Sequence, residues 1–447
     1  MNVAILNGSP AGKDSITLHT MLYIQKHFPE HRFEVLHIGR QIRKMEQEPA
    51  LWRDSLLAAD LVVFCYPVYT FLAPAQMHRF ITLVKESGID LSGKYATQVT
   101  TSKHFYDITA HRFIEDNCAD LGLKYVRGLS ADMEDLLGAK GRRDALAFYR
   151  YVLWSIGRGH CEAQPAYPAF RPVEADPDAE KLDVPAPKRI VIVADFSHSP
   201  DGRLQAMCRR LQNRLPCEAE IVDIQAFPFA GGCLGCFHCA SDGKCVYRDG
   251  FDDYLRSHIQ TADGIVYAYT IHDHSMGYRF KLFDDRQFCN GHRTVTMGRP
   301  VGYLVDGPLD AEENLRTLME ARAQVGGNAL AGIACNQRDP DREIDRLAET
   351  LCYAVTERYQ PPANFYGVGG MKIFRDLIWQ MQGLMREDHR FYKRHGFYDF
   401  PQKRRGRMLA MYLVGAMMRR PKLRKKLGNR MTEGMILPYR KALEKDD

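Results

Sequence analysis

The sequence lacks the features that mark membrane-spanning, disordered or exported proteins. None of its apolar runs approaches the length of about 20 residues that a bilayer-spanning helix needs, and it contains no low-complexity tract. The opening stretch MNVAILNGSP has neither the basic n-region nor the apolar h-region of a signal peptide, so we expect a cytoplasmic location. With 45% hydrophobic and 26% charged residues among 447, the composition is that of a globular protein with room for two or three domains.

The sequence also has no excess of positive charge outside its C-terminal part. The formal net charge is +6, yet from Gly370 onward 20 Lys and Arg stand against 8 Asp and Glu. Within that region, Met408 to Met418 is an apolar stretch bracketed by arginines and too short to span a bilayer. Such a basic, partly apolar helix can lie on a membrane surface or cover a subunit face. A solvated helix docked on the rest of the protein is the simpler expectation.

Apolar runs alternate with helical patterns along the chain. We predict buried strands at residues 3–6, 32–38, 61–64 and 94–101, with helices at residues 15–27 and 74–86. After a proline-rich stretch the pattern restarts, with strands expected at residues 190–194, 218–224, 264–268 and 300–305. The alternation favours an open parallel sheet with helices on both faces, and its recurrence indicates an internal duplication.

We therefore predict two tandem, doubly wound α/β domains followed by a helical extension. The expected boundaries are residues 1–160 for the first domain, 161–187 for a proline-rich linker, 188–338 for the second domain and 339–447 for a basic helical C-terminal region. In such sheets ligands bind beyond the carboxyl ends of the strands, where the strand order reverses. Binding residues are therefore expected in the loops that follow the strands.

Four of the twelve cysteines form one dense run with the spacing C-x2-C-x2-C-x5-C, between residues 233 and 245. The two short spacers let one loop turn three sulfurs toward a point, and Gly243 can adopt a positive φ that brings the fourth around. Thiolates suit iron–sulfur clusters, zinc and Cu(I). A second C-x2-C knuckle, usual for structural zinc, is missing, and a disulfide pair is disfavoured in the cytoplasm. We predict one [4Fe–4S] cluster, with zinc or unliganded thiols as the alternatives; the ligands would be Cys233, Cys236, Cys239 and Cys245.

Two further loops carry polar or aromatic groups at the expected edge of the first sheet. The loop after the first strand, from Asn7 to Thr17, is neither a P-loop nor a G-x-G-x-x-G motif. Its hydroxyl groups and the helix that follows can bind a phosphomonoester, although such a turn also serves simply as a helix cap. The loop after the third strand contains Pro67-Val-Tyr69, which can form the wall of a site for a flat aromatic ligand or be an ordinary hydrophobic loop.

Taken together, Gly-Ser-Pro-x5-Thr after the first strand and Pro-Val-Tyr-x4-Pro-Ala-Gln after the third resemble the NADPH-dependent FMN reductase family of flavodoxin-like proteins. The cysteine run, with Asp252-Asp253 and Ala262-Asp-Gly-Ile-Val beyond it, looks like the iron–sulfur flavoprotein branch. The resemblance covers residues 1–125 and 188–310. It implies that Ser9, Ser15 and Thr17 bind the FMN phosphate, that the isoalloxazine ring lies against Pro67 to Leu72, and that dimers pass electrons between flavin and cluster.

The segment after the fourth strand completes the set of candidate FMN-binding residues. Thr101 to Lys103 fall at the same sheet edge, where Lys103 would hold negative charge at a reduced flavin and His104 would donate a proton; a solvent-exposed loop is an equally plausible interpretation. The full set is Ser9, Lys13, Ser15, Ile16, Thr17, Pro67, Val68, Tyr69, Thr70, Phe71, Leu72, Thr101, Ser102 and Lys103.

The second domain departs from the flavin-binding pattern. Asp195 stands where Gly8 stands in the first domain, and a carboxylate there would repel phosphate. The loop from Tyr269 to Gly277 has lost Pro-Val-Tyr, and we expect its His272 and His274 to be polar loop residues without a metal. We therefore predict that the second domain has lost FMN, keeps the cluster, and packs on the first as an internal pseudo-dimer.

The prediction is a cytoplasmic oxidoreductase, dependent on FMN and a [4Fe–4S] cluster, that passes electrons between a reduced donor and an acceptor. The donor expected is NAD(P)H or a reduced carrier; we expect a homo-oligomer and no nucleic-acid partner. A non-catalytic electron carrier that docks through its basic tail is the alternative, and a zinc-stabilised scaffold is a third. No acid–base triad is evident, and no side chain is assigned a catalytic role.

Overall fold

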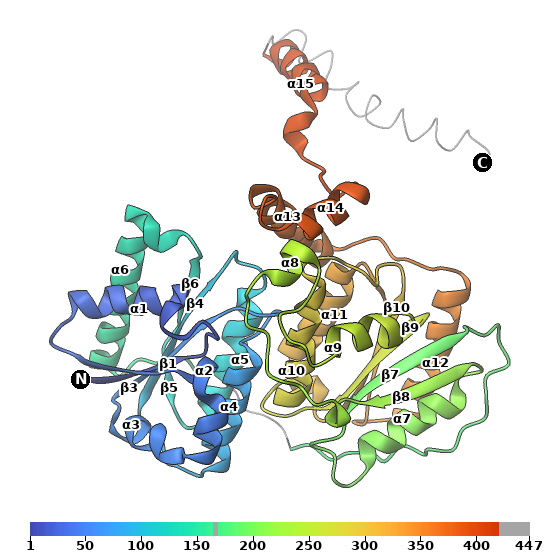
Figure 1. Ribbon diagram of the computed structural model, residues 1–447, viewed down its shortest axis with the longest axis horizontal. Helices are drawn as coiled ribbons and strands as arrows, with labels where there is room; N and C mark the ends of the chain where they lie inside the picture. Colours follow the sequence, from blue (N-terminus) through green and yellow to red (C-terminus); the bar gives the residue numbers. More distant parts are fainter. Residues whose placement is uncertain (164–168, 420–447) are drawn as a thin grey trace. The chain divides into compact units, whose positions relative to one another are not determined.

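The computed structural model describes residues 1–163 and 169–419, and each half of the chain forms one parallel sheet within that part (Figure 1). The first sheet has the strand order β2-β1-β3-β4-β5, and β6 also pairs with β4. Val3 of β1 lies opposite Phe33 of β2 and Leu61 of β3. The inner strands read as continuous apolar runs because helices cover both faces of the sheet. The strands are β1 (Asn2–Asn7), β2 (Arg32–Leu36), β3 (Leu61–Pro67), β4 (Tyr95–Ser102), β5 (Lys124–Tyr125) and β6 (Leu129–Asp132).

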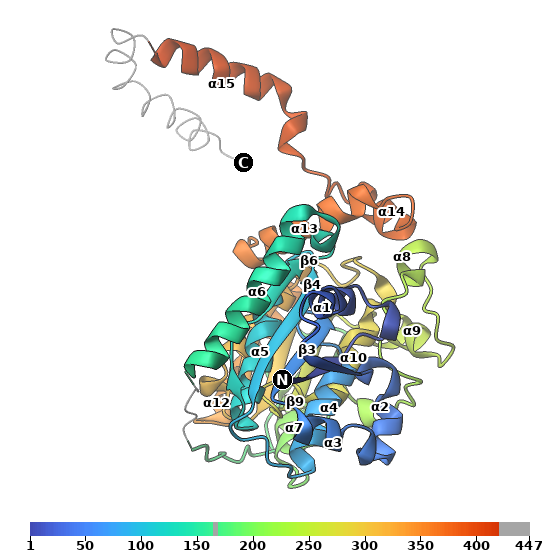
Figure 2. The same ribbon diagram turned by 90° about the vertical axis from the view of Figure 1, so that its left-hand side faces the viewer.

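Two layers of helices cover the first sheet. On one face, α1 and α6 bury Leu18 and Tyr149 against Val3 and Ile5, and Figure 2 shows both helices on the same side of the strands. The helices of the other face share a second core with β1 and β3. The helices are α1 (Ile16–His27), α2 (Ile38–Gln47), α3 (Arg53–Ala58), α4 (Ala75–Glu86), α5 (Asp107–Asp120) and α6 (Ala139–Arg158), with short 3₁₀ turns η1 (Gly12–Asp14), η2 (Pro49–Leu51) and η3 (Asp135–Leu137).

The second sheet has the order β8-β7-β9-β10-β11, and its strands are again parallel. Numbered from the start of each half, both sheets read 2-1-3-4-5, which is the flavodoxin-like order. The fold class is thereby confirmed, whereas the duplication itself stays a prediction. The strands are β7 (Arg189–Asp195), β8 (Glu218–Asp223), β9 (Gly264–Thr270), β10 (Pro300–Asp306) and β11 (Ala329–Cys335).

Helices α7 and α12 cover one face of the second sheet, where Leu204 and Leu347 pack against Ile190 and Ile192. The packing of α12 on this sheet extends the α/β arrangement into residues that the sequence assigned to the C-terminal region. The domain boundaries remain predictions. The elements are α7 (Arg203–Arg214), η4 (Ile224–Ala226), α8 (His238–Asp242), α9 (Phe251–Tyr254), the π-helix η5 (Leu255–Ile259), α10 (Gly277–Arg286), η6 (Gln287–Asn290), η7 (Leu309–Ala311), α11 (Glu313–Gly326) and α12 (Pro340–Thr356).

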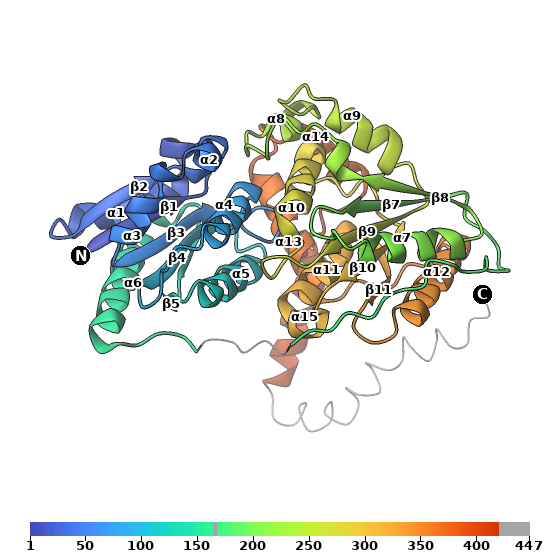
Figure 3. The same ribbon diagram turned by 90° about the horizontal axis from the view of Figure 1, so that it is seen from below.

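The chain divides into two compact units, Met1–Phe391 and Tyr392–Asp447. The first unit contains both sheets. Helices α4 and α10 lie side by side between the sheets and join the two halves (Figure 3). One continuous hydrophobic core includes Phe80 from the first half and Phe280 and Phe283 from the second. The remaining elements are α13 (Phe365–Gln380), α14 (Arg386–Arg394), η8 (Pro401–Lys403) and α15 (Arg405–Met418). Across the residues that the structure describes, no helix is long and apolar enough to cross a membrane.

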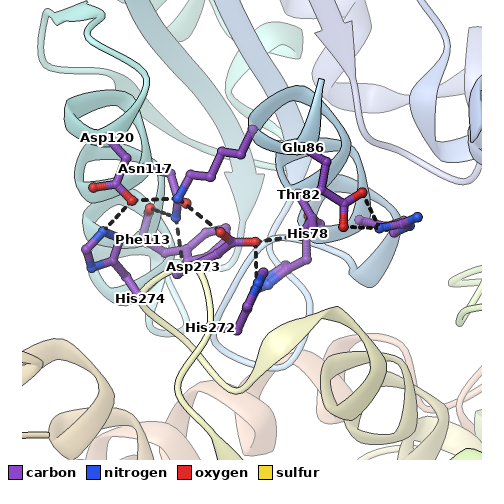
Figure 4. Close-up of polar contacts among 11 residues, drawn as sticks. His78, Thr82, Glu86, Phe113, Asn117, Asp120, His272, Asp273 and His274 are labelled. Carbon is purple, nitrogen blue, oxygen red and sulfur yellow. Dashed lines mark hydrogen bonds and ion pairs between the residues drawn. The ribbon is translucent and has the colours of Figure 1, made fainter. Parts of the chain in front are cut away.

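The turn after β9 contributes a buried polar contact between the two halves (Figure 4). Asp273 accepts a hydrogen bond from Thr82 Oγ1 and forms an ion pair with Lys85 at 3.0 Å. His274 Nε2 lies 2.9 Å from Asp120, and its Nδ1 lies 2.8 Å from Glu312. His274 therefore contacts the first half, whereas His272 pairs with Asp273 of its own turn, and both are polar residues of the loop after β9.

The environment of His274 makes this contact sensitive to pH. Burial by itself would lower the pKa of His274, but hydrogen bonds and charge from Asp120 and Glu312 raise it to about 9. Because the raised pKa belongs to the folded state, the stabilisation is complete below pH 6.5 and is lost as the pH rises through 9.

We expect thermal unfolding between pH 7 and pH 10 to show a loss on the order of 3 kcal/mol that depends on His274. His274→Gln, which cannot take up the proton, should be less stable than the wild type at pH 7 and close to it at pH 10. A constant stability difference across this range would contradict the assignment.

Candidate functional site

A cavity of about 340 Å³ lies at the carboxyl ends of β3 and β4, and residues of both halves line it. From the first half come the β1–α1 loop, the β3–α4 turn and the end of β4. From the second half comes the cysteine loop, defined as Cys233–Cys245. The predicted site residues on its lining are Ser9, Ser15, Ile16, Thr17, Pro67, Val68, Tyr69, Thr70, Thr101, Ser102, Lys103, Cys233, Cys236, Cys239 and Cys245.

The β1–α1 loop presents buried hydroxyl groups at the start of α1. Ser15 is the N-cap of α1 and accepts a hydrogen bond from the amide of Leu18 at 3.3 Å. Thr17 Oγ1 lies 2.6 Å from Thr101 Oγ1, so the loop is tied to the end of β4. The first amides of a helix lack intrahelical acceptors and attract anions. Helix capping by Ser15 and anion binding are compatible interpretations of this loop, because the loop provides both the capping side chain and the donor groups for an anion.

The β3–α4 turn is a tight reversal closed by its own backbone. Tyr69 N donates to Leu72 O at 2.8 Å, and Leu72 N donates to Tyr69 O at 3.0 Å. The two central residues, Thr70 and Phe71, have φ of 45° and 71°, as a type I′ turn requires. Left-handed residues with a side chain cost about 1–2 kcal/mol each, so neighbouring contacts must stabilise this turn.

Some predicted site residues have other environments. Phe71 borders an adjoining cavity of about 150 Å³, and Leu72 is buried in the hydrophobic core. Lys13 lies in η1 and is not among the lining residues of the larger cavity. Lys103 borders that cavity, but its ammonium group binds Asp132 at 2.9 Å and Glu134 at 3.3 Å. These two carboxylates offset the positive charge of Lys103, which was expected to face a reduced flavin.

The cysteine loop packs directly on the first half. A β-carbon at Gly235 would overlap with the hydroxyl oxygen of Tyr69, and the φ of 61° at this residue also favours glycine. Cys236 is exposed, whereas the other three cysteines of the loop are partly buried. The loop thus places its sulfurs beside the β3–α4 turn.

Arginines of the second half hold the loop by its carbonyl groups. Arg293 donates to Cys239 O at 3.0 Å, and Arg256 donates to Gly243 O at 2.7 Å. Arg286 donates to Gly231 O at 2.9 Å and forms a bidentate pair with Asp249. Partial burial would raise the pKa of Asp249, but Arg286 and two backbone amides lower it to about 2.

Burial favours the protonated form of two of the loop's thiols, those of Cys233 and Cys239. Burial raises the pKa of Cys239 to about 11 and that of Cys233 further. Binding of a metal centre by thiolates must therefore release protons. Within residues 1–163 and 169–419, no three His, Cys, Asp or Glu side chains are gathered closely enough to hold a metal ion. The donor set fits a thiolate-bound centre by its chemistry, and the observed side-chain positions do not by themselves form one.

Several lining residues were missed from the sequence. Cys289 lies outside the dense run, and Arg286 and Tyr247 carry no recognisable motif. Three others, Ile373, Phe374 and Leu377, come from α13, so the C-terminal extension provides part of the cavity wall. Phe374 stacks on Phe105 with ring centroids 4.2 Å apart. The apolar spacing of α13 was the available signal, but nothing in it indicates which surface the helix covers.

Comparisons with known proteins bear on part of the chain. Residues 1–111 match the family model of NADPH-dependent FMN reductases. An iron-sulfur flavoprotein of Clostridioides difficile (strain 630) is 19% identical over 177 residues, which is 34% of this chain and 79% of that protein. The matched part of the chain is therefore related to flavin-dependent oxidoreductases.

Solved structures align with about a third of the chain. The flavoenzyme NAD(P)H:(acceptor) oxidoreductase of Paracoccus denitrificans is 19% identical, with a TM-score of 0.30, over 36% of this chain and 99% of that one. A putative quinone reductase from Klebsiella pneumoniae is 17% identical, with a TM-score of 0.28, over 38% and 88%. With TM-scores this low, the flavodoxin-like assignment depends on the strand order.

The contact between Gly235 and Tyr69 can be tested with matched glycine variants. Gly235→Ala should destabilise the protein by about 2–4 kcal/mol, because left-handed strain adds to overlap with the Tyr69 hydroxyl. Gly250→Ala has the same kind of strain at φ 79° but open space around it, so about 1 kcal/mol is expected. Chemical denaturation measures both values. Adding Tyr69→Phe to Gly235→Ala should restore part of the loss; equal destabilisation by the two glycine variants would contradict the contact.

Proposed function

We propose that the protein is an oxidoreductase that binds FMN in its first half and a [4Fe–4S] cluster on the cysteine loop of its second half. The observation that carries the proposal is the shared cavity, which is lined by the β1–α1 loop, the β3–α4 turn and all four cysteines of the run. Its volume of about 340 Å³ lies within the range of about 300–1,000 Å³ that is common for small-molecule sites.

The residues of the first half fit FMN. Ser9, Ser15 and Thr17, with the N-terminus of α1, would hold the phosphate through hydroxyl and backbone donors. Pro67 to Thr70 would lie along the flavin ring, and the wall from α13 would limit access of water. The match of residues 1–111 to the FMN reductase family supports this assignment.

The cysteine loop fits a soft, thiolate-bound centre. Cys233, Cys236, Cys239 and Cys245 border one cavity, and the pKa of Cys239 is raised first by burial and then by nearby charges, those of Cys236 and Cys245 among them. The arginines that bind the loop's carbonyls would hold it in place and place positive charge near an anionic cluster. The name of the C. difficile relative supports a cluster over zinc.

When bound, FMN supplies two-electron chemistry and an iron–sulfur cluster supplies one-electron transfer, so the pair would convert one kind of electron transfer into the other. The chain's own part is to bind both groups, to keep Tyr69 and the cysteine loop in contact, and to shield the site. NAD(P)H is the proposed donor, and the cytoplasm is the proposed location.

Metal and flavin analysis of anaerobically purified protein tests the proposal. We expect four iron and four acid-labile sulfide per chain, with one FMN after reconstitution, because four thiolates are available for one cubane cluster. One equivalent of zinc without sulfide would overturn the cluster, and a failure to take up FMN would overturn the flavin site.

Single variants should separate the two cofactors. Thr17→Asp places a carboxylate beside the phosphate site and should abolish FMN binding, a loss of at least about a hundredfold in affinity, while iron and sulfide remain. Cys245→Ser should lose the cluster, whereas Cys289→Ser, which alters a thiol of the same cavity outside the run, should retain it. Iron, sulfide and flavin assays check each variant; loss of both cofactors in Thr17→Asp would contradict separate sites.

A non-catalytic electron carrier is the second candidate function. The exposure of Cys236 favours it, because a cluster bound there would have an exposed edge that a protein partner could approach. Steady consumption of NAD(P)H with an added acceptor supports the enzyme. Reduction of the cofactors only by a partner protein supports the carrier. Gel filtration tests the proposed homo-oligomer.

We also propose that α15 contacts a membrane surface. Its apolar residues are exposed, Tyr412 to 75% and Leu409 to 63%, and arginines stand at both ends of the apolar stretch. Because both ends of the helix are cationic, two copies of α15 would repel each other whether they packed parallel or antiparallel. The same charges favour binding to an anionic lipid surface, at about 1 kcal/mol per basic residue.

Vesicle flotation tests this contact. Arg405→Glu/Arg407→Glu should weaken binding to phosphatidylserine-containing vesicles at least about tenfold. Arg150→Glu/Arg158→Glu, which reverses two exposed charges on α6, should leave it unchanged. Equal loss in both pairs, or equal binding to neutral vesicles, would overturn the assignment.

A further inference from the structure

We propose that Lys281 and Asp285 of α10 position the β3–α4 turn of the opposite half for FMN binding, so that the second half is needed to form the flavin site. The inference rests on the proposed function, since it concerns the same FMN site. It assigns to the second half a role beyond carrying the cysteine loop.

The β3–α4 turn needs outside support. Thr70 and Phe71 are both left-handed, and neither is a glycine. A β-branched residue such as Thr70 is especially disfavoured there. Such backbone persists only where surrounding contacts hold it in place, and it is common at functional sites.

Helix α10 supplies these contacts. Asp285 Oδ1 accepts a hydrogen bond from Thr70 Oγ1 at 2.9 Å, and its Oδ2 accepts one from the amide of Ala75 at 2.9 Å. Lys281 donates to Tyr69 O at 3.0 Å and pairs with Asp285. Both side chains of the pair are completely buried. The pair therefore binds the turn at three residues: Tyr69, Thr70, and Ala75 at the start of α4.

The position of the gripped residues connects this contact to the cofactor site. Tyr69 and Thr70 border the larger cavity, and Gly235 of the cysteine loop packs on the Tyr69 hydroxyl. A shift of the turn would therefore alter both the wall along the proposed flavin ring and its contact with the cysteine loop.

The turn after β9 provides an internal comparison. It has the same backbone, with Asp273 and His274 left-handed at φ of 53° and 61°, and it docks on α4 of the first half. Here the carboxylate lies on the turn and its partners, Thr82 and Lys85, lie on the helix (Figure 4). Among the described residues, none from His272 to Ser275 lines the larger cavity. Both contacts thus stabilise the interface between the halves. The contact of Lys281 and Asp285 with the β3–α4 turn also borders the proposed cofactor site, whereas the contact of Asp273 with α4 does not.

The experiment compares FMN dissociation constants of the full-length chain, measured by flavin fluorescence titration after removal of bound FMN. Asp285→Asn leaves one acceptor oxygen where two are used, and Lys281 loses its counter-charge; we expect affinity to fall at least about tenfold. Thr70→Val removes only the hydroxyl and should weaken binding about threefold to tenfold, while Thr70→Ser should restore it. Asp273→Asn disturbs the matched contact and should stay within about twofold of the wild type.

Thermal unfolding and iron content of each variant separate positioning from general loosening. Equal FMN affinity of folded Asp285→Asn and wild type would overturn the inference. So would an equal loss of affinity in Asp273→Asn, because the effect would then follow interface stability alone. If Asp285→Asn does not fold, Thr70→Val decides: wild-type affinity in that variant overturns the inference. A wild type that takes up no FMN would instead overturn the proposed function.

Discussion

The packing of α4 against α10 is the interaction on which the rest of the structure depends. Each helix follows the third strand of its own sheet, and together they bring Phe80 and Phe280 into one hydrophobic core. Each is also the docking site for a left-handed turn of the other half. Because hydrophobic burial is non-directional, the buried carboxylates Asp273 and Asp285 supply the register that apolar contact alone would leave free.

This arrangement explains how one site is built from two halves. The first half provides hydroxyl groups, a helix N-terminus and an aromatic turn, and the second half provides four thiols in a loop that lies on that turn. Arginines of the second half bind the loop through its carbonyl groups and so hold its four cysteines at the edge of the cavity. The C-terminal extension takes part as well, since Phe374 of α13 completes the wall next to Phe105. The proposed electron transfer depends on this proximity rather than on an acid–base group.

Much of the fold could be predicted from local patterns. The strands expected at residues 61–64, 190–194 and 300–305 form as β3, β7 and β10, because buried parallel strands leave an uninterrupted apolar signal. The loops that follow β1 and β3 could be recognised because turn and cap chemistry depends on neighbouring residues. The position of the cysteine loop between β8 and α9 followed from its place in the sequence.

Other features of the site carried no local signal. The role of Lys103 beside a flavin stays a prediction, and the sequence did not indicate that Asp132 and Glu134 would bind its ammonium group. His272 and His274 were expected to be polar loop residues, but the sequence did not indicate that His274 would bind Asp120 of the other half. Each of these outcomes depends on which distant side chain arrives nearby, and that is a property of the packed surfaces.

The sequence by itself determined the alternation of strands and helices, the residues available to bind a phosphate, and a dense set of thiols. Only the tertiary structure decided that the cysteine loop packs on the β3–α4 turn, that Asp285 holds Thr70 across 215 residues of chain, and that α13 forms part of the cavity wall. The physical reason is the range of the interactions. Backbone periodicity and turn geometry depend on residues a few positions apart, whereas the contact of two sheets depends on the shape and charge of surfaces that form only after each sheet has folded.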